Sequence, residues 1–179
     1  MILESIFAGF GGQGVLLIGQ ILAYAGMYES KNTTWFPAYG AEVRGGTANC
    51  SVVISDEPIG SPVISEPELI VAMNRPSLER FEEMLKPDGT LFYNSSIIEV
   101  KPKRTDIKAV AIPANDIANE LGNPRVANMV VLGAILKSTG VVNIDTVTKV
   151  LQDKVFTGAK KDLITINRKA LEKGMELVS

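Results

Sequence analysis

The sequence of 179 residues predicts a single α/β domain, residues 1–179, with a largely parallel or mixed β-sheet between two layers of helices. Three observations predict this three-layer α/β/α class. Short apolar runs typical of strands alternate along the chain with longer runs of helical spacing. A glycine-rich loop joins the first strand to the first helix, as in a Rossmann-like βα unit. The length suits one hydrophobic core, and neither a repeat nor a linker divides the chain.

The predicted strands are short apolar runs that end at turn residues. The first covers residues 2–8. Residues 47–55, TANCSVVIS, alternate small or apolar side chains with mostly polar ones, which is the period of a half-buried strand. Residues 31–46 contain Pro37 and three glycines and are therefore predicted as a loop. Further strands are predicted at 69–73, 90–94 and 107–113.

The predicted helices follow these strands. The first, 15–30, is too long and too rich in leucine and alanine for a strand. The second, 75–86, has Pro76 in its first turn, where a missing N–H costs little. Further helices are predicted at 115–121, 124–138, 144–156 and 159–177.

Two of these helices lack a charged face. The stretches 5–28 and 126–136 contain no charged residue, so both helices are apolar around most of their circumference. In the first, Gly19, Ala23 and Gly26 share one face and would let a neighbouring backbone approach closely. Either a well-covered central sheet or a partner chain would bury such helices.

The composition excludes several classes of function. There is no histidine and only one cysteine, Cys50, so the chain has no internal disulfide, no self-contained zinc or iron–sulfur site and no histidine general base. We therefore predict no catalytic residue and no metal site. No apolar run is long enough to span a membrane, the N-terminus has no basic leader, and basic residues do not cluster as in nucleic-acid binders. We expect a cytoplasmic protein.

The stretch FAGFGGQGV, residues 7–15, is the main candidate for a binding site. Its glycines fit G-x-G-x-x-G between a strand and a helix, where bare backbone and a helix N-terminus can receive an anion. A tight corner that only packs helix on strand is the alternative. The complete dinucleotide fingerprint also needs an acidic residue after a second strand, and Glu29 still lies on the helix. The predicted contacts are Gly9, Gly11, Gly12, Gln13 and Gly14.

A second candidate region follows within residues 35–62. It offers large aromatic side chains, an arginine and turn-forming glycines, which are typical of an interface or of an anion contact. A local ion pair between Glu42 and Arg44 is the alternative. The predicted partner or anion contacts are Trp35, Tyr39, Glu42, Arg44, Gly45 and Gly46.

Four stretches together resemble a known family. They are GFGGQGV at 9–15, AYGAEVRGGTANCSVVISDEPIGSP at 38–62, NRPSLERF at 74–81 and NMVVLGAI at 128–135. In this order and spacing they are similar to the gamma subunit of 2-oxoacid:ferredoxin oxidoreductases, over nearly the whole chain. The form YGAEVRGGTANCSV looks closest to the 2-oxoglutarate type, with the pyruvate and branched-chain types next.

The resemblance implies a subunit of a heteromeric complex. Such a complex converts a 2-oxoacid, here expected to be 2-oxoglutarate, and coenzyme A to acyl-CoA and carbon dioxide, and passes the electrons to ferredoxin. Alpha and beta subunits, with or without a delta subunit, hold thiamine diphosphate, magnesium and an iron–sulfur cluster. The gamma subunit of such a complex holds none of these cofactors firmly and is inactive alone. The charge-free helices and the aromatic residues at 35–39 lead us to expect that the isolated chain self-associates, for example as a homodimer.

The resemblance also suggests a ligand for the glycine loop, namely the ADP part of coenzyme A. Two other functions stay open on the sequence. One is a free-standing nucleotide-binding reductase that uses NAD or FAD, and the other is a purely structural subunit that binds no small molecule.

Overall fold

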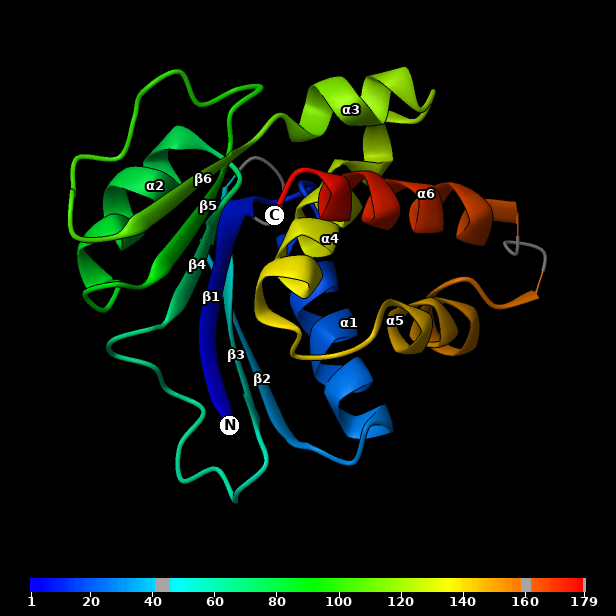
Figure 1. The fold of residues 1–179 in the computed structure, drawn as a ribbon, viewed down its shortest axis with the longest axis horizontal. Coiled ribbons are helices and arrows are strands. Elements are labelled where there is room, and N and C mark those ends of the chain that lie inside the picture. Colours follow the sequence, from blue (N-terminus) through cyan, green and yellow to red (C-terminus); the bar gives the residue numbers. More distant parts are fainter. Residues whose placement is uncertain (41–45, 159–161, 179) are drawn as a thin grey trace.

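The computed structural model describes residues 1–40, 46–158 and 162–178 of the chain. A six-stranded sheet in the order β2-β3-β1-β4-β5-β6 forms its centre (Figure 1). β1, β4, β5 and β6 are parallel, whereas β3 is antiparallel to both of its neighbours. The mixed α/β sheet is therefore confirmed. The strands are β1 (Ile2–Phe10), β2 (Asn32–Tyr39), β3 (Thr47–Ser55), β4 (Leu69–Ala72), β5 (Thr90–Asn94) and β6 (Lys108–Ile112).

The loop predicted at 31–46 is wrong over most of its length, because residues 32–39 form the edge strand β2. Gly40 donates its N–H to the carbonyl of Thr47, so in an antiparallel ladder every second residue from Gly40 bonds to β3. Pro37 lies at one of the intervening positions, which point away from β3. Its missing N–H removes no bond from the ladder, and the β-branched and aromatic residues at 33–36 favour a strand.

The helices lie close to where they are predicted, and most of them are shorter than predicted. Three short segments at helix ends form tighter or wider turns instead of regular α-helix, namely residues 82–84, 124–126 and 151–155. The predicted start of the last helix, 159–161, lies outside the described residues. The helices are α1 (Val15–Tyr28), α2 (Arg75–Phe81), α3 (Ala114–Glu120), α4 (Ala127–Thr139), α5 (Ile144–Val150) and α6 (Asp162–Glu176). None of these is long and apolar enough to cross a lipid bilayer.

Two hydrophobic cores lie on the two faces of the sheet. On β1, Phe7 joins the larger core beneath α1 and α4, while Ile6 and Ala8 point to the smaller core beneath α2. β4 alternates in the same way. Figure 1 shows α1, α4, α5 and α6 on one side of the sheet and α2 on the other, so the predicted three layers are present but unequal.

The charge-free character of α4 is explained by burial within the chain itself. All ten residues from Ala127 to Leu136 are buried, because α4 is covered by α6 as well as by the sheet. The two helices touch through their backbones: a Cβ at Gly133 would overlap the carbonyl of Leu171, and one at Gly174 would overlap the carbonyl of Val130. No partner chain is needed to bury this helix.

The small residues of α1 face the antiparallel strands. A Cβ at Gly19 would lie 2.5 Å from Cys50 Sγ, and one at Gly26 would lie 2.6 Å from Thr33 Cγ2. The close approach predicted for this face is therefore made to β2 and β3. The end of the helix stays open, with Met27 57% exposed.

We predict that Gly174→Ala strongly destabilises the fold, because backbone rather than a flexible side chain occupies the space of the new methyl group. Overpacking of this kind costs about 1–3 kcal/mol or more of the free energy of unfolding, measured by urea denaturation. Gly60→Ala is the matched control, since a Cβ there meets no atom within 4 Å. Equal stability of the two variants would contradict the close helix crossing.

Candidate functional site

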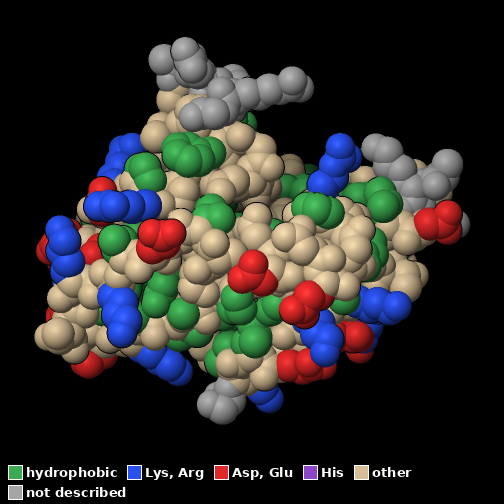
Figure 2. Space-filling model, turned by 90° about the horizontal axis from the view of Figure 1, so that it is seen from above, with side chains coloured by type: hydrophobic (Ala, Val, Ile, Leu, Met, Phe, Trp, Pro, Cys, Tyr) green, Lys and Arg blue, Asp and Glu red, His purple; other side chains and the backbone are tan. Residues whose placement is uncertain are grey.

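The candidate site lies at the carboxyl ends of β1 and β4, two adjacent parallel strands. The helix after β1 packs on one face of the sheet and the helix after β4 on the other. This is a topological switch point, where a crevice opens and where open α/β sheets bind their ligands. Figure 2 looks onto this edge, and apolar and uncharged surface makes up most of the middle of the view.

The glycines of the loop have different structural roles. Gly9 packs tightly, since a Cβ there would lie 2.7 Å from Gln13 Oε1 and 3.0 Å from Met73 Cβ. Gly14 has φ 75° and lies against the amide of Asn128. Gly12 has φ 100°, yet a Cβ there meets no atom within 4 Å. Gly9 and Gly14 thus serve packing and turn geometry, while Gly12 presents bare backbone to open space.

Gln13 fastens this loop to the neighbouring strand end. Its Oε1 accepts hydrogen bonds from the backbone N–H of Phe10 at 2.7 Å and from Asn74 Nδ2 at 3.1 Å. Its Nε2 donates to the carbonyl of Met73 at 3.0 Å. The side-chain amide predicted as a ligand contact is therefore largely committed to holding the crevice in shape.

A small polar pocket of about 130 Å³ lies beside the exposed glycine. Arg125 and Asn128 line it together with Gly12 and Asn115. Arg125 is exposed and forms no ion pair with any described residue. The first N–H groups of α1, which have no partner inside the helix, begin at the same turn. A cation thus lines the same pocket as the bare backbone of Gly12.

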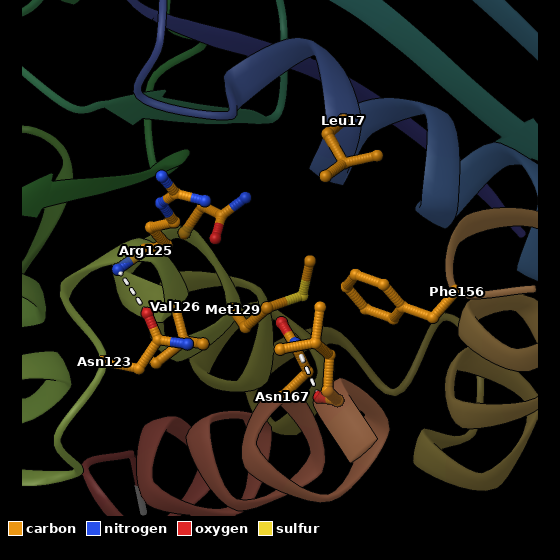
Figure 3. Close-up of a pocket in the computed structure, with 9 residues that line it drawn as sticks. Leu17, Asn123, Arg125, Val126, Met129, Phe156 and Asn167 are labelled. Atoms are coloured by element: carbon orange, nitrogen blue, oxygen red, sulfur yellow. Dashed lines mark hydrogen bonds between the residues drawn. The ribbon is translucent and has the colours of Figure 1, made fainter. Parts of the chain in front are cut away.

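Sequence reasoning missed Arg125 and Asn128. Asn123 and Pro124 are a recognisable helix start, and the Asn123 side chain indeed accepts a hydrogen bond from the N–H of Arg125 (Figure 3). That signal places the arginine at a helix start but does not bring it to a loop more than a hundred residues earlier in the chain.

An apolar pocket of about 270 Å³ lies on the other side of the loop. It brings Tyr39 to Gly11, Gly12 and Gly14, as well as to the first turn of α1. Gly46 also reaches the loop, because its carbonyl accepts the N–H of Gly11 at 2.9 Å.

The other predicted contacts either line a different pocket or lie outside the residues that the structure describes. Trp35 lines a separate pocket between α1 and β2 with Tyr24 and Met27. Glu42, Arg44 and Gly45 lie outside the described residues.

The described side chains around the crevice offer binding groups rather than a nucleophile. Cys50 is fully buried, and burial raises the pKa of its thiol to about 12. The residues that line the two pockets include no acidic side chain in the part of the chain that the structure covers. In that part, no three aspartate, glutamate or cysteine residues gather as metal ligands. The arrangement suits an anionic ligand.

Residues 4–177 match the family described as pyruvate ferredoxin/flavodoxin oxidoreductase. Ketoisovalerate oxidoreductase subunit VorA of Methanothermobacter marburgensis is 42% identical over 171 residues, which are 94% of this chain and 35% of VorA. The chain thus spans about a third of that relative. 2-Oxoglutarate synthase subunit KorC of Methanocaldococcus jannaschii is 33% identical over 97% of this chain and 95% of its own length.

Solved structures agree in fold. The gamma subunit of a keto/oxoacid ferredoxin oxidoreductase from Geobacter sulfurreducens superposes with a TM-score of 0.82 at 31% identity, over 97% of this chain and 96% of the other. The chain also superposes on the 2-oxoglutarate:ferredoxin oxidoreductase of Magnetococcus marinus, which was solved with 2-oxoglutarate, coenzyme A and succinyl-CoA. The TM-score is 0.89 at 27% identity, over 98% of this chain and 31% of the other.

We predict that Gln13→Met, which keeps the volume but removes the amide, lowers the free energy of unfolding by about 1–3 kcal/mol, because the Phe10 N–H and the Met73 carbonyl lose their partner. Urea denaturation measures the loss. Gln20→Met, in the helix that follows the loop, is the control and should be nearly neutral. A neutral Gln13→Met would mean that the glycines alone hold the loop.

Proposed function

The chain belongs to the pyruvate ferredoxin/flavodoxin oxidoreductase family as a subunit of the gamma type, and from this premise we propose that it serves a complex that oxidatively decarboxylates a 2-oxoacid with ferredoxin as electron acceptor. The observation that carries the proposal is the match over nearly the whole chain to a KorC subunit of almost equal length. The chain's own side chains agree with a non-catalytic role. It has no histidine, and its one thiol is buried and protonated at neutral pH.

We propose 2-oxoglutarate as the substrate of the complex. The KorC relatives match this chain over almost the whole of their own length, 95% and 96%, at 33% and 35% identity. 2-Ketoisovalerate is the second candidate, since VorA has the higher identity, 42%. VorA, however, carries this domain inside a chain about three times as long.

The cofactors that the proposed reaction requires do not fit this chain. An iron–sulfur cluster needs about four thiolate ligands, and Cys50 is the only cysteine and is buried. No acidic cluster in the described part could hold the magnesium of thiamine diphosphate. We therefore assign thiamine diphosphate, magnesium and the cluster to alpha and beta subunits.

We further propose that the crevice at the glycine loop receives the ADP part of coenzyme A. The backbone at Gly12 and the first turn of α1 would meet the pyrophosphate, and Arg125 would add a cation beside them. The described lining has no carboxylate to repel the ribose phosphate of coenzyme A. A relative solved with coenzyme A supports the choice of ligand.

The alternative of a free-standing NAD or FAD reductase is disfavoured by geometry. A dinucleotide site needs a parallel strand beside β1 on the side where β3 runs antiparallel. Glu29 lies at the far end of α1, about 20 Å from the loop by helix rise, and accepts hydrogen bonds from Asn143. It is therefore out of reach of a ribose. If coenzyme A does not bind, the conclusion is that the chain is a purely structural subunit.

We predict that the chain purified alone does not reduce viologen with 2-oxoglutarate and coenzyme A, and that activity appears when alpha and beta subunits are added. The reason is that the chain supplies no cofactor ligands and no described nucleophile. The assay is anaerobic viologen reduction at matched protein concentrations. Turnover by the single chain would overturn the assignment.

We predict that Gly12→Val raises the KM for coenzyme A in the assembled complex and leaves the reaction of 2-oxoacid with thiamine diphosphate nearly unchanged. The new side chain would stand in open space at the mouth of the crevice. Gly140→Val controls for backbone strain, because Gly140 also has a positive φ, 60°, and open space for a Cβ. A KM equal to that of the control would leave the loop as a structural corner.

A further inference from the structure

The ribbon formed by β2 and β3 is exposed over part of one face, around Phe36 and Ala38, while Val53 and Ser55 on the same face are buried. Alternation along the strands places Phe36 and Ser51 on the same face as Ile6 of β1, which is the face that α2 covers. α2 packs on β1 and β4 and does not extend over the ribbon (Figure 1). On β2, Phe36 is 50% exposed and Ala38 is also exposed. Among the residues that the structure describes, no strand pairs with the outer edge of β2.

This ribbon contains no charged side chain. The strands Asn32–Tyr39 and Thr47–Ser55 are entirely uncharged, whereas charged residues make up 21% of the chain. Proteins usually protect a free edge strand with charges, and here Pro37 alone interrupts the outward N–H row. Absence of charge around an aromatic side chain is the composition of an interface core. The ribbon is therefore built to be covered.

The length of the relatives indicates what covers it. In VorA and in the Magnetococcus enzyme the same domain is only 35% and 31% of a longer chain. There a covalent link keeps the domain beside the rest of the polypeptide. The remainder of these longer chains is therefore the neighbour that we match to the uncharged ribbon of this domain.

We propose that the uncovered face of the β2–β3 ribbon docks the alpha-type subunit, the counterpart of the two-thirds of VorA that this chain does not span. This inference rests on the proposed function. Phe36 is the anchor, and the facing surface of the partner is uncharged and apolar where it meets this residue. The open edge of β2 lies beside this contact and can accept main-chain hydrogen bonds from the same partner.

The test uses the full chain and the alpha-type subunit encoded in the same genome. Phe36→Lys places a charge at the anchor, and Ala38→Lys adds one on the same face without removing a large side chain. Each should weaken binding by about 30-fold or more, as loss of an interface hot spot does. Ile97→Lys is the control, since Ile97 is an exposed apolar residue, 45% accessible, in the loop after β5. Calorimetry gives the affinities, and circular dichroism checks that each variant is folded.

Hydrogen exchange supplies the second readout. Amides of residues 32–39 should become protected when the alpha-type subunit is added, and those of 95–100 should not. Normal binding by folded Ala38→Lys, or a ribbon without protection, would overturn the docking face while leaving the proposed function intact. A dimer of this chain broken by Phe36→Lys would overturn it in favour of a second copy. Failure of the unaltered chain to bind the alpha-type subunit would overturn both the docking face and the proposed function.

Discussion

The turn after β1 depends on one side-chain amide. Gln13 reaches back to Phe10 and across to Met73 and Asn74, so the ends of β1 and β4 are held at a fixed separation. The glycines on either side permit this arrangement: Gly9 leaves room for the amide, and Gly14 starts α1 in a left-handed conformation. If the amide were free to bind a ligand, the crevice would lose the contact that shapes it. The bare backbone of Gly12 lies next to this amide in the same turn, and Arg125 reaches the same pocket from the turn just before α4.

The sequence predicts a strand or helix correctly where the periodicity of its side chains agrees with the turn residues at its ends. The first strand and helix, the glycine loop between them and the strand at 47–55 follow from periodicity and turn residues, and the structure has them all. β2 was missed because Pro37 and three glycines indicate a loop, and only its position at the sheet edge makes the proline harmless. Arg125 and Asn128 were missed for a different reason, since only tertiary structure brings them to the loop. Of the loop residues predicted as ligand contacts, Gly9, Gly14 and Gln13 have packing or hydrogen-bonding roles, and ligand binding by the loop stays a prediction.

The two charge-free helices show how much a lack of charged residues reveals about what buries a helix. In α4 the lack of charge reflects burial between α6 and the sheet, and it carries no information about partners. In α1 one face is occupied by the antiparallel strands, through Gly19 and Gly26. Exposed apolar surface is instead found on β2, at Phe36 and Tyr39, in a stretch that the sequence pattern indicates as a loop. Surface available to a partner therefore has to be judged on the folded chain.

The burial of Cys50 has a practical consequence for spectroscopy. The thiol is the only one in the chain, is inaccessible in the folded state and has a pKa of about 12, so maleimide and iodoacetamide reagents find almost no thiolate there. The native chain thus behaves toward these reagents as if it were free of cysteine. A single cysteine introduced on any exposed position would carry a fluorophore or spin label alone, without first removing the natural thiol from the core. Distances between such a label and other subunits could then be measured in a chain whose interior is unaltered.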